Sequence, residues 1–377
     1  MLVIVQDVPT QFDVPLYNKV ALEKAMPIKV IYTQAASADM EIGQSPRWDH
    51  IEHHLYPHRY LNDSERHNAK AVVQAILREK PKHVVISGYW PKLHRDIMRL
   101  LQAKKVSVGL RSDNTIQHSR LGGLRGQLKR LYLSRLLAHY DVWHPVGNQA
   151  AEYLENLSSR ARPVYLFPYN VDSDWFREQA GRTRAKRNQY LLDLGWPVDS
   201  FVVLGIMKWA EREDPLTLLR AFEMYQKSHS NARLVLVGDG PLREQVASSI
   251  DQLSEYVTTP GYVSYSGLPF WYGLADVFVH PAPGEPWGVS VSESLASGVP
   301  VIASTGVGAA KEQVTPAING EIFQQGDAKS LLEALKRWRA NSKESDVDQI
   351  RDRCYSALDL WCYEQSIETF KRVLNDA

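Results

Sequence analysis

Short apolar runs alternate with amphipathic stretches of helical length along the chain. In the first half the apolar runs are Leu2–Val5, Ile28–Tyr32, His83–Ser87, Val106–Leu110 and Val142–His144. The stretches with helical periodicity between them are Leu16–Ala25, Ala69–Arg78 and His94–Gln102. Strands that alternate with helices are typical of a parallel sheet with helices on both faces. The first half is therefore predicted to form a doubly wound α/β domain.

The second half repeats this alternation. Its apolar runs are Phe201–Ile206, Arg233–Val237, Val277–His280 and Val299–Ala303. Its helical stretches are Leu216–Lys227, Leu242–Leu253 and Val289–Ser297, and Asp346–Ala377 is predicted to form one or two further helices. Nearly continuous Val, Leu and Ile runs favour strands that are buried on both faces. A second doubly wound domain is therefore expected.

A length of 377 residues also favours two domains. The turn-rich segment Phe167–Asp172 and the basic, poorly hydrophobic segment Arg182–Arg187 indicate the boundary. The predicted divisions are an N-terminal domain at 1–170, a linker at 171–187, a C-terminal domain at 188–355, and a terminal helix at 356–377 that packs back toward the N-terminal domain. The predicted fold class is α/β, with two Rossmann-like domains facing each other across a cleft and ligands at the carboxyl ends of the strands.

Composition narrows the function classes. Lys and Arg number 44 against 43 Asp and Glu, and this balance argues against a nucleic-acid partner. Cys354 and Cys362, if they share a helix, lie about 12 Å apart, too far for a disulfide, so a reducing compartment is expected. The first residues, Met1–Asp7, lack signal-peptide features, and no apolar run approaches the length of a membrane span. A soluble cytoplasmic protein is expected.

The segment Gly284–Glu293 carries the most informative chemistry. It follows an apolar run and enters a predicted helix, where Gly288 allows close backbone approach and the first amides of the helix can bind a pyrophosphate. Glu285 and Glu293 flank this helix start and could grip hydroxyls on either side of the phosphates, as in a sugar nucleotide. The alternative, a loop acid and an exposed helix residue, stays open at this point.

Neighbouring segments strengthen the first interpretation. Two glutamates separated by seven residues, with a glycine between them, resemble the hallmark of the retaining glycosyltransferases of family 4, which have the two-domain GT-B fold. The resemblance continues through Leu234–Leu242, Gly261–Val263, Ala275–Val279, Ala296–Ala303 and Asn319-Gly320, and Pro168–Asp172 stands where the family has its linker motif. It covers nearly all of the second half, and the first half is less similar.

The resemblance implies roles for individual residues. Glu285 would contact hydroxyls of the transferred sugar as a catalytic residue, and Glu293 would contact the ribose hydroxyls. The other donor-binding positions that it implies in this region are Gly238, Tyr262, Val263, Trp287, Gly288 and Val289. For Gly238, the alternative of a plain turn before a helix stays open.

The family also uses an Arg and a Lys five residues apart to stabilise the departing diphosphate. Lys208 falls at the Arg position, but Glu213 falls at the Lys position. Arg212, one residue earlier, is the candidate substitute, so Lys208 and Arg212 are predicted to bind the donor phosphates, with Lys208 also predicted to be catalytic. A solvated loop of mixed charge is the alternative for Arg212.

First-domain candidates lie in two predicted loops. Asp13 follows the first strand and is a candidate acceptor contact, with capping of the next helix as the alternative. Asp113 follows the strand that ends at Leu110, where the family often carries a His or Asp facing the donor sugar. Asp113 is the catalytic candidate and His118 the second choice, while a turn or capping Asp is the alternative.

No metal site is predicted. Asp172-Ser173-Asp174 has the form of a metal-binding Asp-x-Asp motif but lies in the predicted linker, where turn chemistry accounts for it. A cluster of histidines (His50, His53, His54, His58 and His67) has no accompanying cysteine and is interrupted by Pro57, which favours a surface loop over a zinc site.

A basic, Leu-rich stretch runs from Arg120 to Arg135. It includes Arg125, Lys129 and Arg130 and could contact anionic lipid as an amphipathic helix, placing the protein at the inner face of the membrane. A helix that packs on its own domain is the alternative.

Together these features predict a retaining, metal-independent glycosyltransferase without a cofactor. The resemblance implies transfer from a UDP- or GDP-sugar to a hydroxyl of a glycan or lipid-linked acceptor, in polysaccharide or glycolipid synthesis, with the departing phosphate helping to deprotonate the acceptor. The alternatives are a sugar-nucleotide epimerase or phosphorylase on the same fold, and a non-catalytic subunit that binds sugar nucleotide or glycan. The sequence specifies neither the base, the sugar nor the acceptor.

Overall fold

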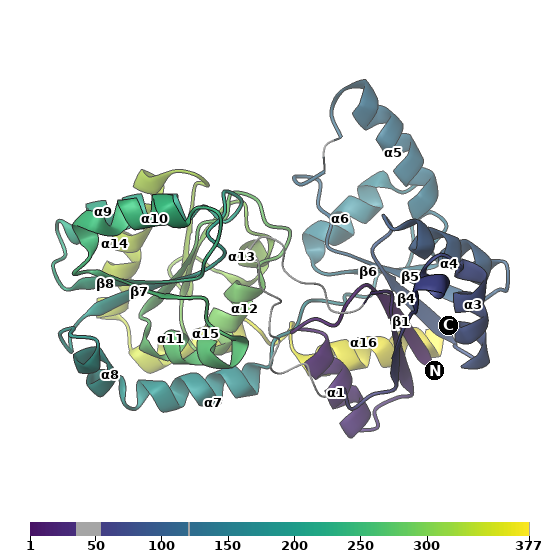
Figure 1. Cartoon of the computed structure of the whole chain (residues 1–377), viewed down its shortest axis with the longest axis horizontal. Helices are drawn as coiled ribbons and strands as arrows, with labels where there is room; N and C mark the ends of the chain where they lie inside the picture. Colours follow the sequence, from purple (N-terminus) through teal and green to yellow (C-terminus); the bar gives the residue numbers. More distant parts are fainter. Residues whose placement is uncertain (35–53, 120, 377) are drawn as a thin grey trace. The chain divides into compact units, whose positions relative to one another are not determined.

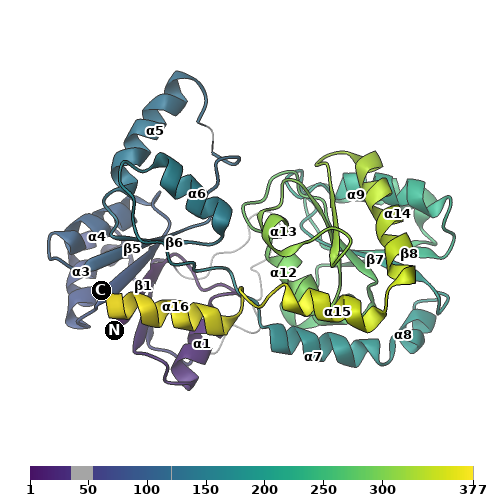
Figure 2. The same ribbon diagram turned by 180° about the vertical axis from the view of Figure 1, so that it is seen from behind.

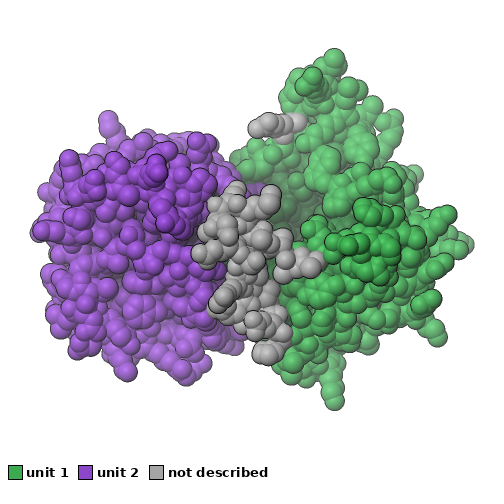
Figure 3. Space-filling view, in the orientation of Figure 1, with its two compact units in different colours: residues 1–38, 50–170, 361–377 green, residues 39–49, 171–360 purple. Residues whose placement is uncertain are grey.

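A computed structural model describes residues 1–34, 54–119 and 121–376 of the chain. These residues form two compact units, coloured separately in Figure 3. Unit 1 comprises the described residues up to Asn170 together with Trp361–Asp376, and unit 2 comprises Val171–Leu360. The chain therefore passes from one unit to the other after Asn170 and returns after Leu360.

Unit 1 is built on a six-stranded parallel sheet with the strand order β3-β2-β1-β4-β5-β6. The strands are β1 (Leu2–Gln6), β2 (Ile28–Tyr32), β3 (His58–Tyr60), β4 (His83–Ser87), β5 (Ser107–Ser112) and β6 (Val142–Pro145). The helices are α1 (Val14–Leu22), α2 (Asp63–Arg66), α3 (Ala69–Arg78), α4 (Lys92–Gln102), α5 (Gly123–Leu137), α6 (Asn148–Leu157) and α16 (Tyr363–Asp376). The main apolar core joins one sheet face to α3, α4, α5 and α6.

The C-terminal helix α16 packs beside α1 in unit 1, as Figure 2 shows. Asn170 anchors its start: the carboxamide donates to the carbonyl oxygens of Trp361 (2.5 Å) and Cys362 (3.1 Å) and accepts from Ser366 Oγ (2.7 Å). Lys19 of α1 also pairs with Glu364 of α16 at 2.9 Å. Asn170, the last residue before the chain leaves unit 1, thus binds the start of α16, where the chain returns to unit 1.

A buried pair of histidines crosses the sheet of unit 1. His83 Nε2 and His144 Nε2 lie 3.0 Å apart, on the two strands that flank β5. Gly109 of β5 leaves room for both rings, since a Cβ there would lie 2.5–2.6 Å from imidazole atoms. His144 Nδ1 faces the Tyr165 carbonyl oxygen (3.0 Å) and His83 Nδ1 faces Ser107 Oγ (2.8 Å). We assign one direction to the network: Ser107 donates to His83, His83 donates to His144, and His144 donates to Tyr165. Both rings are then neutral.

This pair is expected to make unit 1 sensitive to acid. Burial lowers the pKa of His144 to about 4, and burial followed by the neighbouring His144 holds the pKa of His83 well below its usual range. The stability that the neutral rings contribute is present above pH 6.5 and is lost as the pH falls toward 4, by about 3 kcal/mol for His144 alone. Hydrogen exchange of β4, β5 and β6 amides as a function of pH measures this loss. An H83L/H144L variant is the control, and an equal pH dependence in that variant would contradict the assignment.

Unit 2 has a second six-stranded parallel sheet, with the strand order β12-β11-β10-β7-β8-β9. The strands are β7 (Phe201–Ile206), β8 (Ala232–Val237), β9 (Val257–Gly261), β10 (Val277–His280), β11 (Val301–Ser304) and β12 (Gly320–Phe323). The helices are α7 (Ser173–Arg184), α8 (Arg187–Asp193), α9 (Pro215–Gln226), α10 (Arg243–Ile250), α11 (Leu268–Leu274), α12 (Val289–Ala296), α13 (Gly308–Gln313), α14 (Ala328–Glu344) and α15 (Val347–Ser356), with short 3-10 turns at Asp251–Leu253 and Tyr265–Gly267. Helices α9, α10 and α14 cover one face of the sheet, and α7, α11 and α15 cover the other (Figure 1).

Residues predicted as a linker, 171–187, differ from that prediction because most of them form α7, which packs against α11. Asp172 caps the helix by accepting from the Trp175 amide at 3.1 Å. Phe176, Ala180 and Thr183 recur on one face and are buried, so a narrow apolar stripe suffices to fold this otherwise polar segment.

The two cysteines do not share a helix, which corrects the premise behind their predicted separation. Cys354 is buried in α15 of unit 2, whereas Cys362 precedes α16 in unit 1, and no disulfide joins them. Among the described residues, every helix is either too short or too polar to cross a lipid bilayer.

Candidate active site

The candidate site of unit 2 lies at the topological switch point of the sheet, between β7 and β10. β7 and β10 are neighbours, but the sheet extends through β8 and β9 on one side and through β11 and β12 on the other. Ligands of doubly wound sheets bind at the carboxyl ends of such neighbouring strands. The two loops that leave these ends are residues 207–214 and 281–288, and they carry Lys208, Glu213 and Glu285.

Gly288 shapes the start of α12. Its φ of +100° lies in the left-handed region that favours glycine. A Cβ at this position would lie 2.9 Å from Val307 Cγ1 and 3.4 Å from His280 Nε2, so a side chain would be both strained and crowded. No side chain among the described residues caps α12, and the first amides of the helix point toward the loop. A helix start of this kind is suited to an anion, and binding of phosphate by the amides of Gly288 and Val289 stays a prediction.

Glu285 is held in place by backbone and side-chain contacts. Its amide donates to the Gly306 carbonyl oxygen and its carbonyl oxygen accepts from the Gly308 amide, both at 3.0 Å. Its carboxylate Oε2 accepts from His280 Nε2 at 2.6 Å, and Ser290 Oγ lies 3.5 Å from the other ring nitrogen of His280. The half-buried carboxylate is thus aimed by a buried histidine at the end of β10.

Glu213 joins this pair from the loop after β7. One ligand atom each from Glu213, His280 and Glu285 lie within 4.8 Å of one another, an arrangement that could hold a metal ion. Burial and the nearby Glu285 carboxylate raise the pKa of Glu213. Burial disfavours the protonated form of His280, but the carboxylates of Glu285 and Glu213 outweigh it and raise the pKa of His280. The charges of Glu213, His280 and Glu285 therefore influence one another, and the protonated form of His280 balances part of the negative charge of the two carboxylates.

Glu293 is a buried side chain, only 3% exposed, so the alternative of an exposed helix residue is wrong. Its Oε2 accepts from the Tyr272 hydroxyl at 3.3 Å. Burial raises the pKa of Glu293 to about 7, although the Tyr272 hydrogen bond opposes this shift. A buried carboxyl group inside α12 that ionises near neutral pH can exchange hydrogen bonds with a polar ligand.

The predicted cations lie beside Glu213. Lys208 is half-buried in the loop after β7, and Arg212 is largely exposed, with Nε 3.7 Å from Glu213 Oε1. Both positive charges favour the ionised form of Glu213. Glu213 stands at the position where the resembled family has its lysine. This chain therefore has a carboxylate near both cations and Glu285.

The remaining predicted donor positions occupy the same end of the sheet. Gly238 follows β8 and packs against the Met207 carbonyl oxygen, while Tyr262 and Val263 follow β9. Tyr262 is exposed, whereas Trp287 is buried, and its carbonyl oxygen accepts from the Ala309 amide at 2.7 Å. Trp287 thus holds the loop onto α13.

Sequence reasoning missed His280, Tyr272 and Trp209. His280 is the last residue of β10, and this place at a carboxyl end is a signal that could have singled it out. Tyr272 lies in the middle of α11 and carries no such signal. Trp209 is buried beside Gly238, and its indole Nε1 has no hydrogen-bond partner among the described residues.

Unit 1 has its own cavity, of about 220 Å³, where β1, β4 and β5 end. Asp7, Asp13, Arg111, Asp113 and Tyr169 are among its lining residues. Asp113 is half-buried and accepts from the Tyr169 hydroxyl at 3.1 Å. The cavity again lies where the sheet changes direction, between β1 and β4. It places Asp113 and Asp13 on one polar wall.

Asp13 is engaged by Arg111 within this wall. Arg111 donates to Asp13 Oδ1 at 2.7 Å, and also to the carbonyl oxygens of Phe167 (3.1 Å) and Pro168 (2.9 Å). Both side chains of the ion pair are buried. Asp13 stands at the start of α1 but its side chain makes no capping hydrogen bond, so the capping alternative is wrong. The carboxylate instead neutralises Arg111 because a buried guanidinium needs a counter-charge.

The other first-half candidates lie apart from this ion pair. His118 is exposed, and its Nδ1 lies 2.6 Å from Thr115 Oγ1. The rings of His54 and His58 contact each other in a tilted arrangement with centroids 4.4 Å apart, while His67 follows the last residue of α2. His50, His53 and Arg120 lie outside the described residues. Glu213, His280 and Glu285 form the one group of three potential metal ligands found in the described parts of the chain.

Comparison with known proteins agrees with this geometry. Residues 187–353 match the sequence profile of the family described as "Glycosyl transferases group 1". This range contains all of the donor-side residues predicted in unit 2. Over the whole chain, the structure resembles HepE from Anabaena, solved in complex with UDP and glucose (TM-score 0.74, 14% identity, 100% of both chains covered). A glycosyltransferase structure from Rickettsia africae gives a TM-score of 0.77 at 13% identity, covering 100% of this chain and 98% of the other. The fold is GT-B, which confirms the predicted fold class.

Curated relatives match part of the chain. The alpha-monoglucosyldiacylglycerol synthase of Acholeplasma laidlawii is 32% identical over 111 residues, which cover 29% of this chain and 28% of that protein. A GDP-mannose-dependent alpha-(1-6)-phosphatidylinositol monomannoside mannosyltransferase of Mycobacterium tuberculosis is 30% identical over 189 residues, which cover 48% of each chain. The chain therefore matches about half or less of the length of these relatives, which are named as glycosyltransferases or a glycolipid synthase.

Proposed function

We propose that the protein is a retaining glycosyltransferase that moves a sugar from a nucleotide-diphosphate sugar to a hydroxyl of a glycan or glycolipid. The observation that carries the proposal is the meeting point of two loops at the switch point of unit 2: residues 207–214, which carry Lys208, and residues 281–288, which carry Glu285 and lead into α12. That meeting point lies inside the region that matches the glycosyltransferase profile.

The residues have distinct tasks in this proposal. The amides of Gly288 and Val289 bind the diphosphate, and Lys208 and Arg212 stabilise the negative charge that grows on it as the sugar departs. Glu285, oriented by His280, accepts hydrogen bonds from hydroxyls of the sugar. Glu293 reaches the ribose hydroxyls from within α12, and its raised pKa lets it exchange hydrogen bonds with them without a fixed charge.

In unit 1, Asp113 is the proposed catalytic partner of the donor sugar, and Asp13 and His118 are the proposed acceptor-side residues. Asp113 is the best placed of the three. It lines the unit 1 cavity, and the Tyr169 hydroxyl that bonds to its carboxylate is neutral, so its charge is not balanced by that contact. Asp13 acts there by holding Arg111. No dedicated nucleophile is required, because the departing phosphate can take the proton of the acceptor hydroxyl.

A donor panel tests the function. UDP, GDP and ADP, and their glucose and mannose conjugates, are scanned for a rise in melting temperature, because a ligand that binds only the folded state stabilises it. The stabilising donor is then incubated with diacylglycerol and glycan acceptors. Transfer with an α-linked product from an α-linked donor supports the proposal. Conversion of the donor without acceptor indicates an epimerase, consumption of free phosphate a phosphorylase, and binding without turnover a non-catalytic subunit.

Chelation tests whether the group formed by Glu213, His280 and Glu285 works with a metal. We expect EDTA to leave the transfer rate within about 2-fold of the untreated rate, because His280 already balances the two carboxylates through its contact with Glu285. In parallel reactions, Mg²⁺, Mn²⁺ or Zn²⁺ is added after EDTA treatment, and the transfer rate is measured again. A loss of more than about 10-fold on chelation, restored by one of these ions, would contradict metal independence.

Helix α5 supports a lipid-linked acceptor and contact with a membrane surface. It projects from the body of unit 1 (Figure 1), and Leu124 and Leu128 are 75% and 62% exposed. Leu131 continues the same face at helical spacing, and Arg125 and Arg130 are exposed beside it. The other side of α5 packs on its own domain through Leu133, Leu136 and Leu137. Exposed leucines bordered by cations are typical of a helix that lies in a membrane interface.

Vesicle binding tests this surface. We expect the protein to co-sediment with vesicles containing phosphatidylglycerol, and an R125Q/R130Q variant to bind them about 10-fold or more weakly, because each surface cation contributes about 1 kcal/mol. L124S/L128S is expected to weaken binding as well. Leu22→Ser, at an exposed leucine of α1, is the control and should bind normally. Equal binding by all variants would contradict the assignment.

A further inference from the structure

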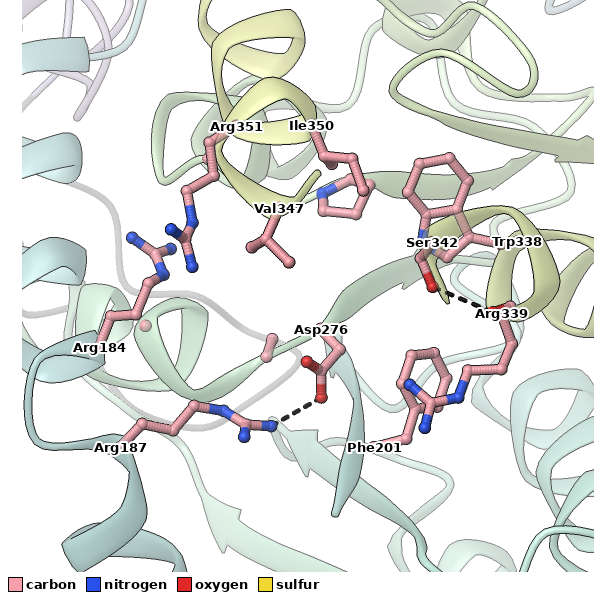
Figure 4. A pocket seen from close by; sticks show the side chains of 14 residues that line it. Arg184, Arg187, Phe201, Asp276, Trp338, Arg339, Ser342, Val347, Ile350 and Arg351 are labelled. Atoms are coloured by element: carbon pink, nitrogen blue, oxygen red, sulfur yellow. Dashed lines mark hydrogen bonds and ion pairs between the residues drawn. The ribbon is translucent and has the colours of Figure 1, made fainter. Parts of the chain in front are cut away.

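A second cavity, of about 250 Å³, lies in unit 2 at the amino ends of the strands, whereas Glu285 follows the carboxyl end of β10. It opens beside Phe201 and Asp276, where β7 and β10 begin (Figure 4). Four arginines line it: Arg184 from α7, Arg187 from α8, Arg339 from α14 and Arg351 from α15. Asp276 is the one carboxylate among its lining residues. The cavity is distinct from the proposed donor site, because it lies at the amino ends of the strands.

Arg187, one of the four arginines, is already bound to groups of the protein. Arg187 donates to Asp276 Oδ2 at 2.7 Å, to the Leu274 carbonyl oxygen at 3.0 Å and to the Ser200 carbonyl oxygen at 2.9 Å. Asp276 Oδ2 also accepts from the Val202 amide at 2.7 Å. This ion pair closes the floor of the cavity and leaves no further carboxylate in its lining for the other arginines.

The other three arginines bring an excess of positive charge. Arg184 donates to the Ser297 carbonyl oxygen at 2.7 Å, and burial followed by the nearby charge of Arg351 lowers the pKa of Arg184. Arg351 contacts Asp348 at 2.5 Å, but that carboxylate lies outside the lining and is exposed. The Arg339 guanidinium lies over the Phe201 ring at 4.2 Å and donates no hydrogen bond to the described residues; the Arg339 contact in Figure 4 is its carbonyl oxygen, which accepts from Ser342 Oγ at 3.2 Å. Arg184 and Arg351 thus lie near each other on one side of the cavity, with Arg339 across from them beside Phe201, and the only carboxylate among the lining residues is already paired (Figure 4).

We propose that this cavity is a binding site for a small soluble phosphate or phosphate monoester. Like charges that line one cavity repel one another, and a doubly charged anion between them reduces that repulsion. Guanidinium groups match phosphate oxygens with paired hydrogen bonds, so Arg184, Arg339 and Arg351 can each contribute. The bound anion joins α7, α14 and α15, and α7 and α15 are the helices that adjoin the two passages of the chain between the units. The site is independent of the proposed glycosyl transfer.

Calorimetric titration of the full chain with inorganic phosphate, at constant ionic strength set with NaCl, tests this site. We expect phosphate to bind this cavity separately from any binding at the α12 start, and an R351Q or R339Q substitution to raise the Kd of this cavity at least about 10-fold, because each removes a charge-assisted hydrogen-bond donor. Arg353→Gln is the control: Arg353 is exposed on the same helix as Arg351 and is not a lining residue, and its loss changes the net charge equally. Glycerol 3-phosphate is expected to compete with phosphate.

Melting temperatures separate a binding role from a structural one. Without phosphate, R351Q should melt at the same temperature as the wild type or higher, because the substitution relieves repulsion, and phosphate should stabilise only the wild type and R353Q. A lower melting point of R351Q without phosphate would assign Arg351 a structural role and overturn the proposal. Equal phosphate binding by R351Q, R353Q and the wild type would also overturn it. Binding of phosphatidic acid vesicles without binding of the soluble phosphates would assign a lipid headgroup instead.

Discussion

Replacing Glu285 with glutamine is expected to reduce sugar transfer by about 100- to 1000-fold, the range that follows the loss of one polar group aimed at a transition state. The substitution keeps the shape of the side chain but removes the charge that strengthens hydrogen bonds to sugar hydroxyls. It also removes one of the two carboxylates that raise the pKa of His280. Burial, which lowers this pKa, is then opposed only by Glu213. The measurement is kcat/KM with the donor found in the panel, over pH 5 to 9.

The controls for Glu285 separate chemistry from folding. Glu223→Gln removes an exposed carboxylate of α9 that pairs only with Lys227 in the interactions described, and it should leave transfer unchanged. The melting temperature of the Glu285 variant should stay close to that of the wild type, because the carboxylate is partly exposed. Transfer within about 3-fold of the wild type would exclude Glu285 from the catalytic machinery.

Replacing Asp13 with alanine is expected to destabilise unit 1 by about 3–5 kcal/mol. The reason is that Arg111 would remain buried with only carbonyl oxygens as hydrogen-bond partners and no counter-charge. Hydrogen exchange of the β1 and β5 amides in unit 1 is the appropriate measurement, since a chain with two units need not unfold in one step. The loss should appear there and leave the strands of unit 2 protected.

Asp63→Ala is the matched control for Asp13. Asp63 also pairs with an arginine, Arg66, but its side chain is 94% exposed, and such pairs contribute about 1 kcal/mol or less. A D13A/R111M double variant should recover part of the lost stability, because it removes the uncompensated charge together with its partner. A loss below about 1 kcal/mol for D13A would show that the carbonyl oxygens alone satisfy Arg111.

The central strands of both sheets could be predicted from the sequence because they are buried on both faces. Ile28–Tyr32, His83–Ser87, Phe201–Ile206 and Val277–His280 are found with the predicted bounds. The strands that the pattern missed are β3, β9 and β12, each at an edge of its sheet. β3 has no buried residue and β9 has one, so neither shows the continuous apolar run of a central strand.

The candidate site was predictable where its chemistry is local in sequence. Glu285, Gly288 and Glu293 belong to one loop and the helix that follows it, so their spacing alone indicates an anion site between two carboxyl groups. The contact of Glu213 with Glu285 and His280 joins two loops far apart in the chain, and only the sheet order brings them together. The pairing of Asp13 with Arg111, 98 residues apart, lies beyond local patterns for the same reason.

The route of the chain has a consequence for the order in which the protein is made. Because unit 1 contains residues on both sides of unit 2, the ribosome releases all of unit 2 before it releases α16. Asn170 cannot form its hydrogen bonds with Trp361, Cys362 and Ser366 until those residues are released. The packing of α1 against α16 is delayed in the same way. Unit 2 can therefore complete its folding first, whereas the α1 face of unit 1 stays open until residues 361–376 have been made and released. A released chain that ends at residue 360 should accordingly resist protease in unit 2 and be cleaved in unit 1.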